Sequence, residues 1–177
     1  MTNHHELHCQ AHVDHDYASV RETLLADKRE ILREATRRAA AAAVTTELGV
    51  MVGVYELIAE LELAVESTWP SRSPAGKPAL AITLSWRSPR RLEWFPTMSA
   101  TMTCYALSAT ETEIDLDGAY DPARSVFGTI DPGTTNRFTH RVVENFVREV
   151  AASVQEEVGR RRSMAARATL VAQPVAG

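Results

Sequence analysis

Two kinds of hydrophobic spacing divide the chain, and the broadest helical stripe lies near the C-terminal end. From about residue 136 to residue 158, apolar residues recur every three or four positions, which is the period of an α-helix. This stripe covers about half of the helix circumference, more than a surface helix needs. A broad layer must cover it, and a curved sheet is the obvious candidate. The stripe comprises Phe138, Val142, Val143, Phe146, Val147, Val150, Val154 and Val158.

Strict alternation of apolar and polar residues predicts strands in much of the preceding chain. In residues 6–14, Leu7, Cys9, Ala11 and Val13 share one face. The alternating pattern returns at residue 45, passes a predicted turn at Gly53 and continues to residue 65. Residues 70–78 are rich in Ser, Pro and Gly, which predicts an exposed loop.

Three later segments predict strands with clear apolar faces, and the last two form the clearest hairpin of the chain. A turn at residues 108–110 joins these two, and Pro122 ends the second. Gly118 permits a close backbone approach within the hairpin. The inward faces are Leu80, Ile82, Leu84 and Trp86, then Met98, Ala100, Met102, Cys104 and Ala106, then Thr112, Ile114, Leu116, Gly118 and Tyr120.

Residues 16–43 have helical spacing with a break in the middle. Asp16 or Ser19 can cap the start, and Asp27 with Lys28 marks the break between two short helices. Without a repeat or a second core, we expect one domain over residues 1–160. Residues 161–177 contain few aromatic residues, which predicts a flexible C-terminal tail.

The composition of the chain argues against some classes of function but does not indicate one. The 177 residues are 45% hydrophobic and carry a formal net charge of -4, so nothing indicates binding to nucleic acid. No apolar stretch approaches a membrane span or a signal peptide, so we expect no integral membrane association and a cytoplasmic location. Cys9 and Cys104 lie in apolar strand faces, which favours reduced core thiols over a disulfide.

Five of the six histidines lie within the first 15 residues, which raises the question of a metal site. On a helix, His8, His12 and His15 would share a face and could bind a transition metal. On a strand, His8 and His12 would share the solvent face about 13 Å apart and could not bind one ion together. The apolar alternation favours the strand, so we expect no metal and no cofactor.

Short motifs between residues 84 and 150 carry a family resemblance. They are LSW at 84–86, WFPTMSATM at 94–102, TEIDLDGAYDP at 112–122, FG at 127–128 and HRVVENFVREV at 140–150. With the order of predicted elements, the chain resembles uncharacterised bacterial members of the SRPBCC superfamily, which are START-like and polyketide cyclase-like. The resemblance implies an α+β helix-grip fold. In that fold a curved antiparallel β-sheet wraps around a long C-terminal helix, and two short helices follow the first strand.

One segment departs from the pattern of the family. Residues 123–126, ARSV, stand where many relatives have a small Pro-Leu-Gly segment. Because this loop often borders the cavity mouth in the fold, cavity access and ligand size do not carry over from the relatives.

The chemistry in the chain favours binding over catalysis. It has no nucleophile elbow, phosphate-binding loop, dinucleotide fingerprint or paired Cys-x-x-Cys. The leading hypothesis is a protein that holds a hydrophobic small molecule or lipid between sheet and C-terminal helix. The alternatives are a polyketide cyclase or aromatase-like enzyme, which needs an acid–base pair in the cavity, and a protein-interaction module. The predicted ligand-binding residues are Trp86, Met98, Met102, Tyr120, Phe146 and Val150.

Overall fold

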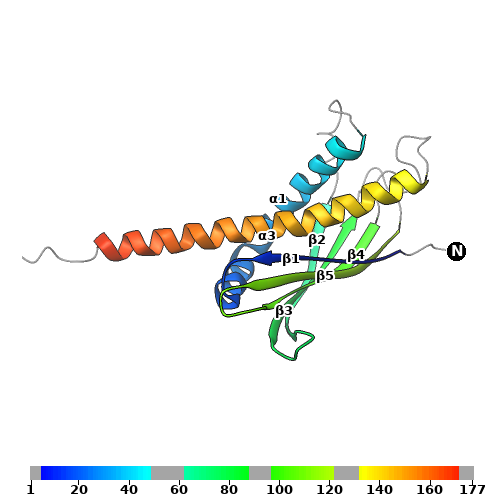
Figure 1. Cartoon of the computed structure of the whole chain (residues 1–177). Coiled ribbons are helices and arrows are strands. Elements are labelled where there is room, and N and C mark those ends of the chain that lie inside the picture. Colours follow the sequence, from blue (N-terminus) through cyan, green and yellow to red (C-terminus); the bar gives the residue numbers. More distant parts are fainter. Residues whose placement is uncertain (1–4, 49–61, 88–96, 122–131, 172–177) are drawn as a thin grey trace, which may run out of the picture.

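One antiparallel sheet and two long helices make up the described part of the chain in the computed structural model (Figure 1). The structure describes residues 5–48, 62–87, 97–121 and 132–171. The five strands have the order β1-β5-β4-β3-β2. The elements are β1 (His5–Val13), α1 (Tyr17–Leu48), β2 (Glu62–Arg72), β3 (Pro78–Arg87), β4 (Thr97–Ala106), β5 (Thr112–Asp121) and α3 (Pro132–Val171).

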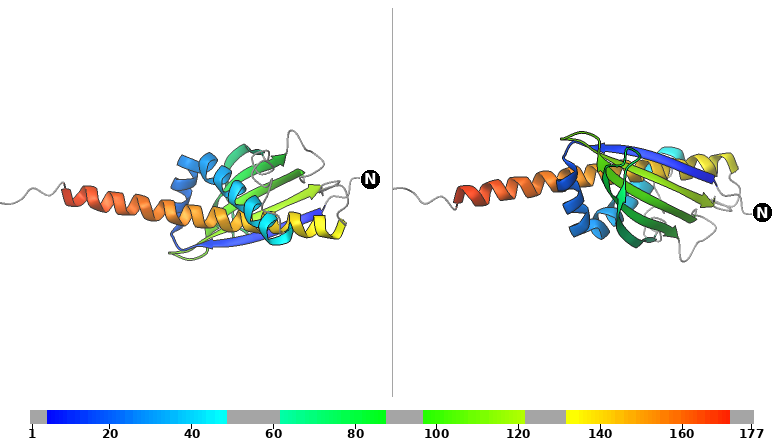
Figure 2. Two further views of the ribbon diagram at one scale, coloured as in Figure 1. Left: turned by 90° about the horizontal axis from the view of Figure 1, so that it is seen from above. Right: turned by 90° about the horizontal axis from the view of Figure 1, so that it is seen from below.

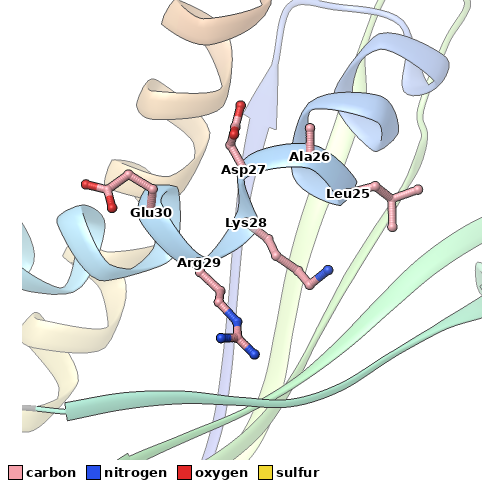
Figure 3. A pocket seen from close by; sticks show the side chains of 6 residues that line it. All are labelled: Leu25, Ala26, Asp27, Lys28, Arg29 and Glu30. Atoms are coloured by element: carbon pink, nitrogen blue, oxygen red, sulfur yellow. The ribbon is translucent and has the colours of Figure 1, made fainter.

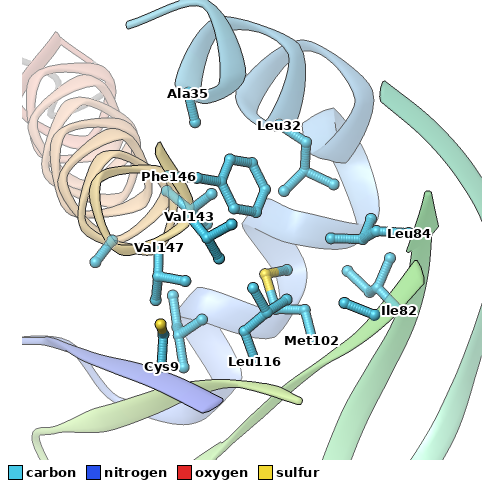
Figure 4. Close-up of a cluster of buried hydrophobic side chains, with 14 of the residues drawn as sticks. Cys9, Leu32, Ala35, Ile82, Leu84, Met102, Leu116, Val143, Phe146 and Val147 are labelled. Atoms are coloured by element: carbon cyan, nitrogen blue, oxygen red, sulfur yellow. The ribbon is translucent and has the colours of Figure 1, made fainter. Parts of the chain in front are cut away.

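Both helices cover the same face of the sheet, and the core lies between these two layers. In Figure 2, α3 and the second half of α1 lie in front of the sheet in one view and behind it in the opposite view. Figure 4 shows Phe146 and Val143 of α3 and Leu32 of α1 facing Leu84 and other residues of the sheet. The α+β class with a long C-terminal helix on an antiparallel sheet is confirmed.

The predicted inward faces agree with the observed burial. Leu80, Ile82, Leu84 and Trp86 of β3 are all buried, as are the alternate residues of β4 from Met98 to Cys104. On α3, the stripe from Val142 to Val158 is buried, while Phe138 lies outside the residues with described side chains. Strands β3 and β4 therefore present the faces that their alternation predicts, because successive side chains of a strand point to opposite sides.

The break predicted in the N-terminal helical region is a kink of α1 at Asp27. The backbone there has φ -123° and ψ 16°, which is not helical. Asp16 is the cap, since its carboxylate accepts a hydrogen bond from the backbone N–H of Ser19 at 2.9 Å. The second part of the helix is longer than the short helix that we expected.

The strand predicted from residue 45 is wrong at its start, because α1 continues to Leu48. The alanine-rich run before it has high helix propensity, and each further residue of a helix adds one hydrogen bond. The predicted turn at Gly53 lies outside the described residues.

The loop predicted at residues 70–78 is shorter than expected. Strand β2 continues to Arg72, with Pro70 paired to Leu80, and the turn occupies only the residues between β2 and β3. Proline is tolerated in β2 because this strand lies at the edge of the sheet and needs no donor on its free side. Gly76 has φ +76°, the left-handed conformation that favours glycine.

The flexible tail expected from residue 161 is helical as far as Val171, as part of α3. Residues 163–169 are exposed, so this extension does not pack on the core. Its arginine, alanine and methionine residues are good helix formers, which extends the helix without tertiary support. None of the described helices combines the length and the apolar character needed to cross a membrane.

Candidate functional site

Three of the predicted ligand-binding residues form one row across the inner face of the sheet. Trp86 of β3 pairs with Met98 of β4, and Met98 pairs with Tyr120 of β5. The row lies at one end of the sheet, because these residues stand next to the ends of their strands. The side chains of all three residues are buried. At the far end of the row, the ring of His5 stacks on Tyr120 with the ring centroids 5.3 Å apart.

Helix α3 adds Phe146 to this row, so that four of the six predicted residues come together. The rings of Trp86 and Phe146 are 4.8 Å apart and nearly perpendicular, at 81°. This edge-to-face arrangement is favourable and orients both rings. We call the group of Trp86, Met98, Tyr120 and Phe146 the Trp86 row.

Met102 lies elsewhere in the core. It pairs with Ile82 on one side and with Leu116 on the other, two inward positions away from Met98. Figure 4 shows Met102 beside Leu116 and Ile82 in the packed middle of the sheet. Val150 lies one turn beyond Phe146 on α3 and is fully buried. Both residues therefore belong to the buried core.

The indole nitrogen of Trp86 is a buried donor without a partner. Nε1 is shielded from solvent and has no hydrogen-bond acceptor within the described parts of the chain. A buried N–H that lacks a partner loses its hydrogen bond to water, at a cost of about 1–3 kcal/mol. Such a group in a native structure calls for a physical explanation. A ligand atom that accepts this hydrogen bond is one explanation.

The two cysteine thiols and the Tyr120 hydroxyl on the inner face of the described sheet stay protonated near pH 7. Burial raises the pKa of the Cys104 thiol to about 12 and that of Cys9 to about 11. Burial also raises the pKa of the Tyr120 hydroxyl. Both cysteines are free, as predicted. Groups with pKa values so far above neutrality are poor nucleophiles and poor general bases at physiological pH.

A second cluster of polar side chains lies on the opposite face of the sheet, where β1 pairs with β5. His8 Nδ1 lies 2.7 Å from Asp117 Oδ1 and 3.5 Å from Asp115 Oδ1. The hydrogen bond to Asp117 is the largest cause that raises the pKa of His8, followed by the negative charge of Asp115. Next to it, His12 Nδ1 lies 3.4 Å from a carboxylate oxygen of Glu113.

The donor atoms of His8, Asp115 and Asp117 all lie within 4.8 Å of one another, and such a set could hold a divalent cation. The His8 and Asp117 side chains are more than half exposed, and the ion pair already satisfies them. The prediction that the histidines bind no metal therefore stays a prediction. The sequence shows the acidic alternation in β5, but it does not show that β1 lies beside β5.

A shallow pocket at the kink of α1 is a weaker candidate for a binding site than the Trp86 row. It is lined by Leu25 to Glu30, which all belong to one short segment (Figure 3). Of these, Asp27 already forms an ion pair with Arg161 of α3. Because no other element contributes to the lining, the pocket has no converging groups that could bind a specific ligand.

Comparisons with known proteins give likenesses of structure only. No protein-family model and no curated protein matches the sequence. Three of the solved structures that align with most of the chain illustrate this. Zhui aromatase/cyclase from Streptomyces sp. R1128 has a TM-score of 0.44 and 13% identity over 90% of this chain and 96% of its own. Ara h 8.0201 has a TM-score of 0.45 and 8% identity over 88% and 98%. TTHA0849 from Thermus thermophilus has a TM-score of 0.42 and 14% identity over 86% and 99%.

The chain has a helix-grip fold. Its antiparallel sheet packs around a long C-terminal helix, in the order of elements that defines this fold. At such low TM-scores and identities the likeness concerns the arrangement of elements alone.

Proposed function

We propose that this protein binds a hydrophobic small molecule at the Trp86 row, between the end of the sheet and helix α3. The observation that carries the proposal is the buried Trp86 Nε1–H, which has no acceptor within the described chain. Met102 and Leu84 lie buried in the middle of the core. The unpartnered N–H lies at the end of the sheet, so a guest that accepts its hydrogen bond would lie there.

The chemical character of the row suits an apolar guest. Trp86 and Phe146 offer large ring surfaces, and Met98 has a flexible thioether that adapts to varied shapes. Burial of apolar surface contributes about 25 cal/mol per Å², so a guest of ordinary size would bind at about micromolar strength without a charged contact. Affinity should then depend little on salt concentration.

Binding is a better account of these residues than catalysis. A cyclase or aromatase-like reaction needs a group near the substrate that gains or loses a proton at neutral pH. On the described inner face, burial moves the pKa values of Cys9, Cys104 and Tyr120 away from neutrality. No specific observation in the described chain favours the protein-interaction alternative.

The test fills the row and measures the binding of a neutral fluorescent probe. N-phenyl-1-naphthylamine is titrated against wild type and against Met98→Trp, which adds bulk between Trp86 and Tyr120. We expect micromolar binding by wild type and at least about tenfold weaker binding by the variant, because the added ring occupies the space of the guest. Circular dichroism would check that the variant is folded.

Met164→Trp is the matched control, since Met164 is 59% exposed on the far part of α3. It makes the same substitution away from the row and should bind the probe as wild type does. Equal binding by wild type and a folded Met98→Trp would place the guest elsewhere and overturn the proposal.

A further inference from the structure

The polarity of the Trp86 row restricts the chemical class of its guest, and this step rests on the function proposed above. We infer that the ligand presents a neutral hydrogen-bond acceptor, such as a ketone, quinone or ester carbonyl, to Nε1 of Trp86.

The donor is well defined in position. Trp86 is 1% exposed, and its indole ring is fixed by the edge-to-face contact with Phe146 and by its place beside Met98. Indole Nε1–H is a donor only, so its partner must be an acceptor. A guest without such an atom would leave the N–H unpaired, and a site with an unpaired buried donor discriminates against that guest.

The absence of buried positive charge points to a neutral acceptor rather than a carboxylate. Among the described residues no lysine or arginine is buried, and the one buried acid, Glu113, alternates with the inward residues of β5. A carboxylate at Trp86 would therefore be buried without a counter-charge, which is costly. Burial raises the pKa of the Tyr120 hydroxyl in the same row, because burial disfavours the charged phenolate. A buried carboxylate would be disfavoured for the same reason.

Three naphthalene probes of nearly equal shape separate these possibilities. Acetylnaphthalene carries a ketone, isopropenylnaphthalene replaces its oxygen with a methylene group, and naphthoate carries a carboxylate, all at ring position two. Their dissociation constants for wild type and Trp86→Phe would be measured by titration calorimetry. The preference for ketone over alkene should be roughly threefold to tenfold larger in wild type, because one neutral hydrogen bond is lost in the variant.

Trp69→Phe is the matched control for the substitution. Trp69 is 38% exposed on β2, and its replacement should leave the preference for the ketone unchanged. Naphthoate should be the weakest of the three ligands for wild type.

A spectroscopic measurement on wild type keeps the inference testable where Trp86→Phe does not fold. The chain has three tryptophans, so ¹⁵N-labelled protein gives three indole N–H signals, which single Trp→Phe variants at the other two positions assign. The Trp86 signal should move downfield with the ketone and not with the alkene. Movement with the ketone alone supports the inference.

The outcomes separate the two proposals. If ketone and alkene bind to wild type but show the same preference in Trp86→Phe, and the Trp86 signal does not respond to the ketone, the inference is wrong while the apolar site stands. The face of Phe146 would then be the acceptor of the N–H. Tightest binding of naphthoate would also overturn it. If wild type binds none of the three, the proposed function fails and the inference fails with it.

Discussion

Gly118 shows how one residue permits two strands to approach. A Cβ atom at this position would lie 2.5 Å from the Cβ of Ala100 and 2.5 Å from the carbonyl oxygen of Ser99. Both neighbours belong to the paired strand β4, so neither can move without disturbing the sheet. The sequence predicted this close approach from a glycine in the middle of an alternating strand.

We therefore expect Gly118→Ala to lower the free energy of unfolding by about 1–3 kcal/mol, the usual cost of overpacking. Urea denaturation would measure it. Gly159→Ala is the control, because a Cβ at Gly159 meets nothing within 4 Å. It lies inside α3, where alanine stabilises by up to about 1 kcal/mol relative to glycine. Equal effects of the two substitutions would contradict the steric argument.

His8 gives the outer face of the sheet a dependence on pH. Its pKa is raised by the hydrogen bond to Asp117 and by the charge of Asp115. A raised folded-state pKa means that the contribution of His8 to stability is fully present below the unfolded value of 6.5. This contribution is lost as the pH rises through the folded pKa. The side chain is 59% exposed, so solvent screens the interaction and the effect is small.

The difference in unfolding free energy between wild type and His8→Asn should accordingly be larger at acidic than at alkaline pH. An NMR titration of the His8 ring tests the cause directly. Its pKa should lie above 6.5 in wild type and fall in Asp117→Asn, which removes the largest contribution. A pKa that does not change in Asp117→Asn would rule out this ion pair as the cause.

At the scale of elements, the sequence predicts which side chains of a strand face inward. It does not predict which strands lie side by side. Alternation alone places Leu84, Met102 and Ile114 inward, because strand geometry fixes the face of every second residue. The contact of His8 with Asp117 joins residues 109 positions apart, and nothing local in the sequence encodes that pairing. The Trp86 row likewise depends on the register of three strands. Its members were predicted to face inward, but their alignment needed the structure.

The C-terminal ends of the two helices were also predicted wrongly from the sequence. Residues 44–46 are β-branched, which favours a strand, yet α1 continues through them. The alanine run before them has high helix propensity, and propagation of the helix outweighs the weak local preference. Helix α3 continues beyond the expected boundary at residue 160 because the residues that follow are good helix formers.

The packing of α3 on the sheet can be tested at Phe146, which is fully buried against Trp86. Phe146→Ala should cost about 3–5 kcal/mol, because it removes a large ring and leaves a cavity in a closely packed layer. Chemical denaturation provides the measurement. Met164→Ala, an exposed position of the same helix, should change stability by less than about 0.5 kcal/mol. A loss at Phe146 under about 1 kcal/mol would show that the Phe146 ring does not pack closely against the sheet.

At the scale of the whole molecule, ion pairs connect α3 to α1 where α3 leaves the core. Arg161 pairs with Asp27 at the kink of α1, and Arg162 pairs with Asp16, the cap of the same helix. Nearby, the backbone N–H of Asp14 donates a hydrogen bond to Gln155 at 2.8 Å. These contacts hold the start of α1 against α3. Beyond Arg162, the described residues as far as 169 are exposed.

Two truncations should therefore differ although they end only three residues apart. A chain that stops after Arg162 keeps both ion pairs and should lose less than about 0.5 kcal/mol, because the removed part of α3 makes few tertiary contacts. A chain that stops after Gly159 also loses Arg161 and Arg162 with their pairs to α1, and Arg160 with its pair to Glu157 of α3. Each exposed pair contributes about 0.2–1 kcal/mol. Thermal and urea unfolding of both chains at low and high salt would measure the difference. It should shrink at high salt, since salt screens exposed charges. Equal stability of the two truncated chains at low salt would mean that these arginines do not fasten α3 to α1, and that burial of residues such as Val158 alone holds the two helices together.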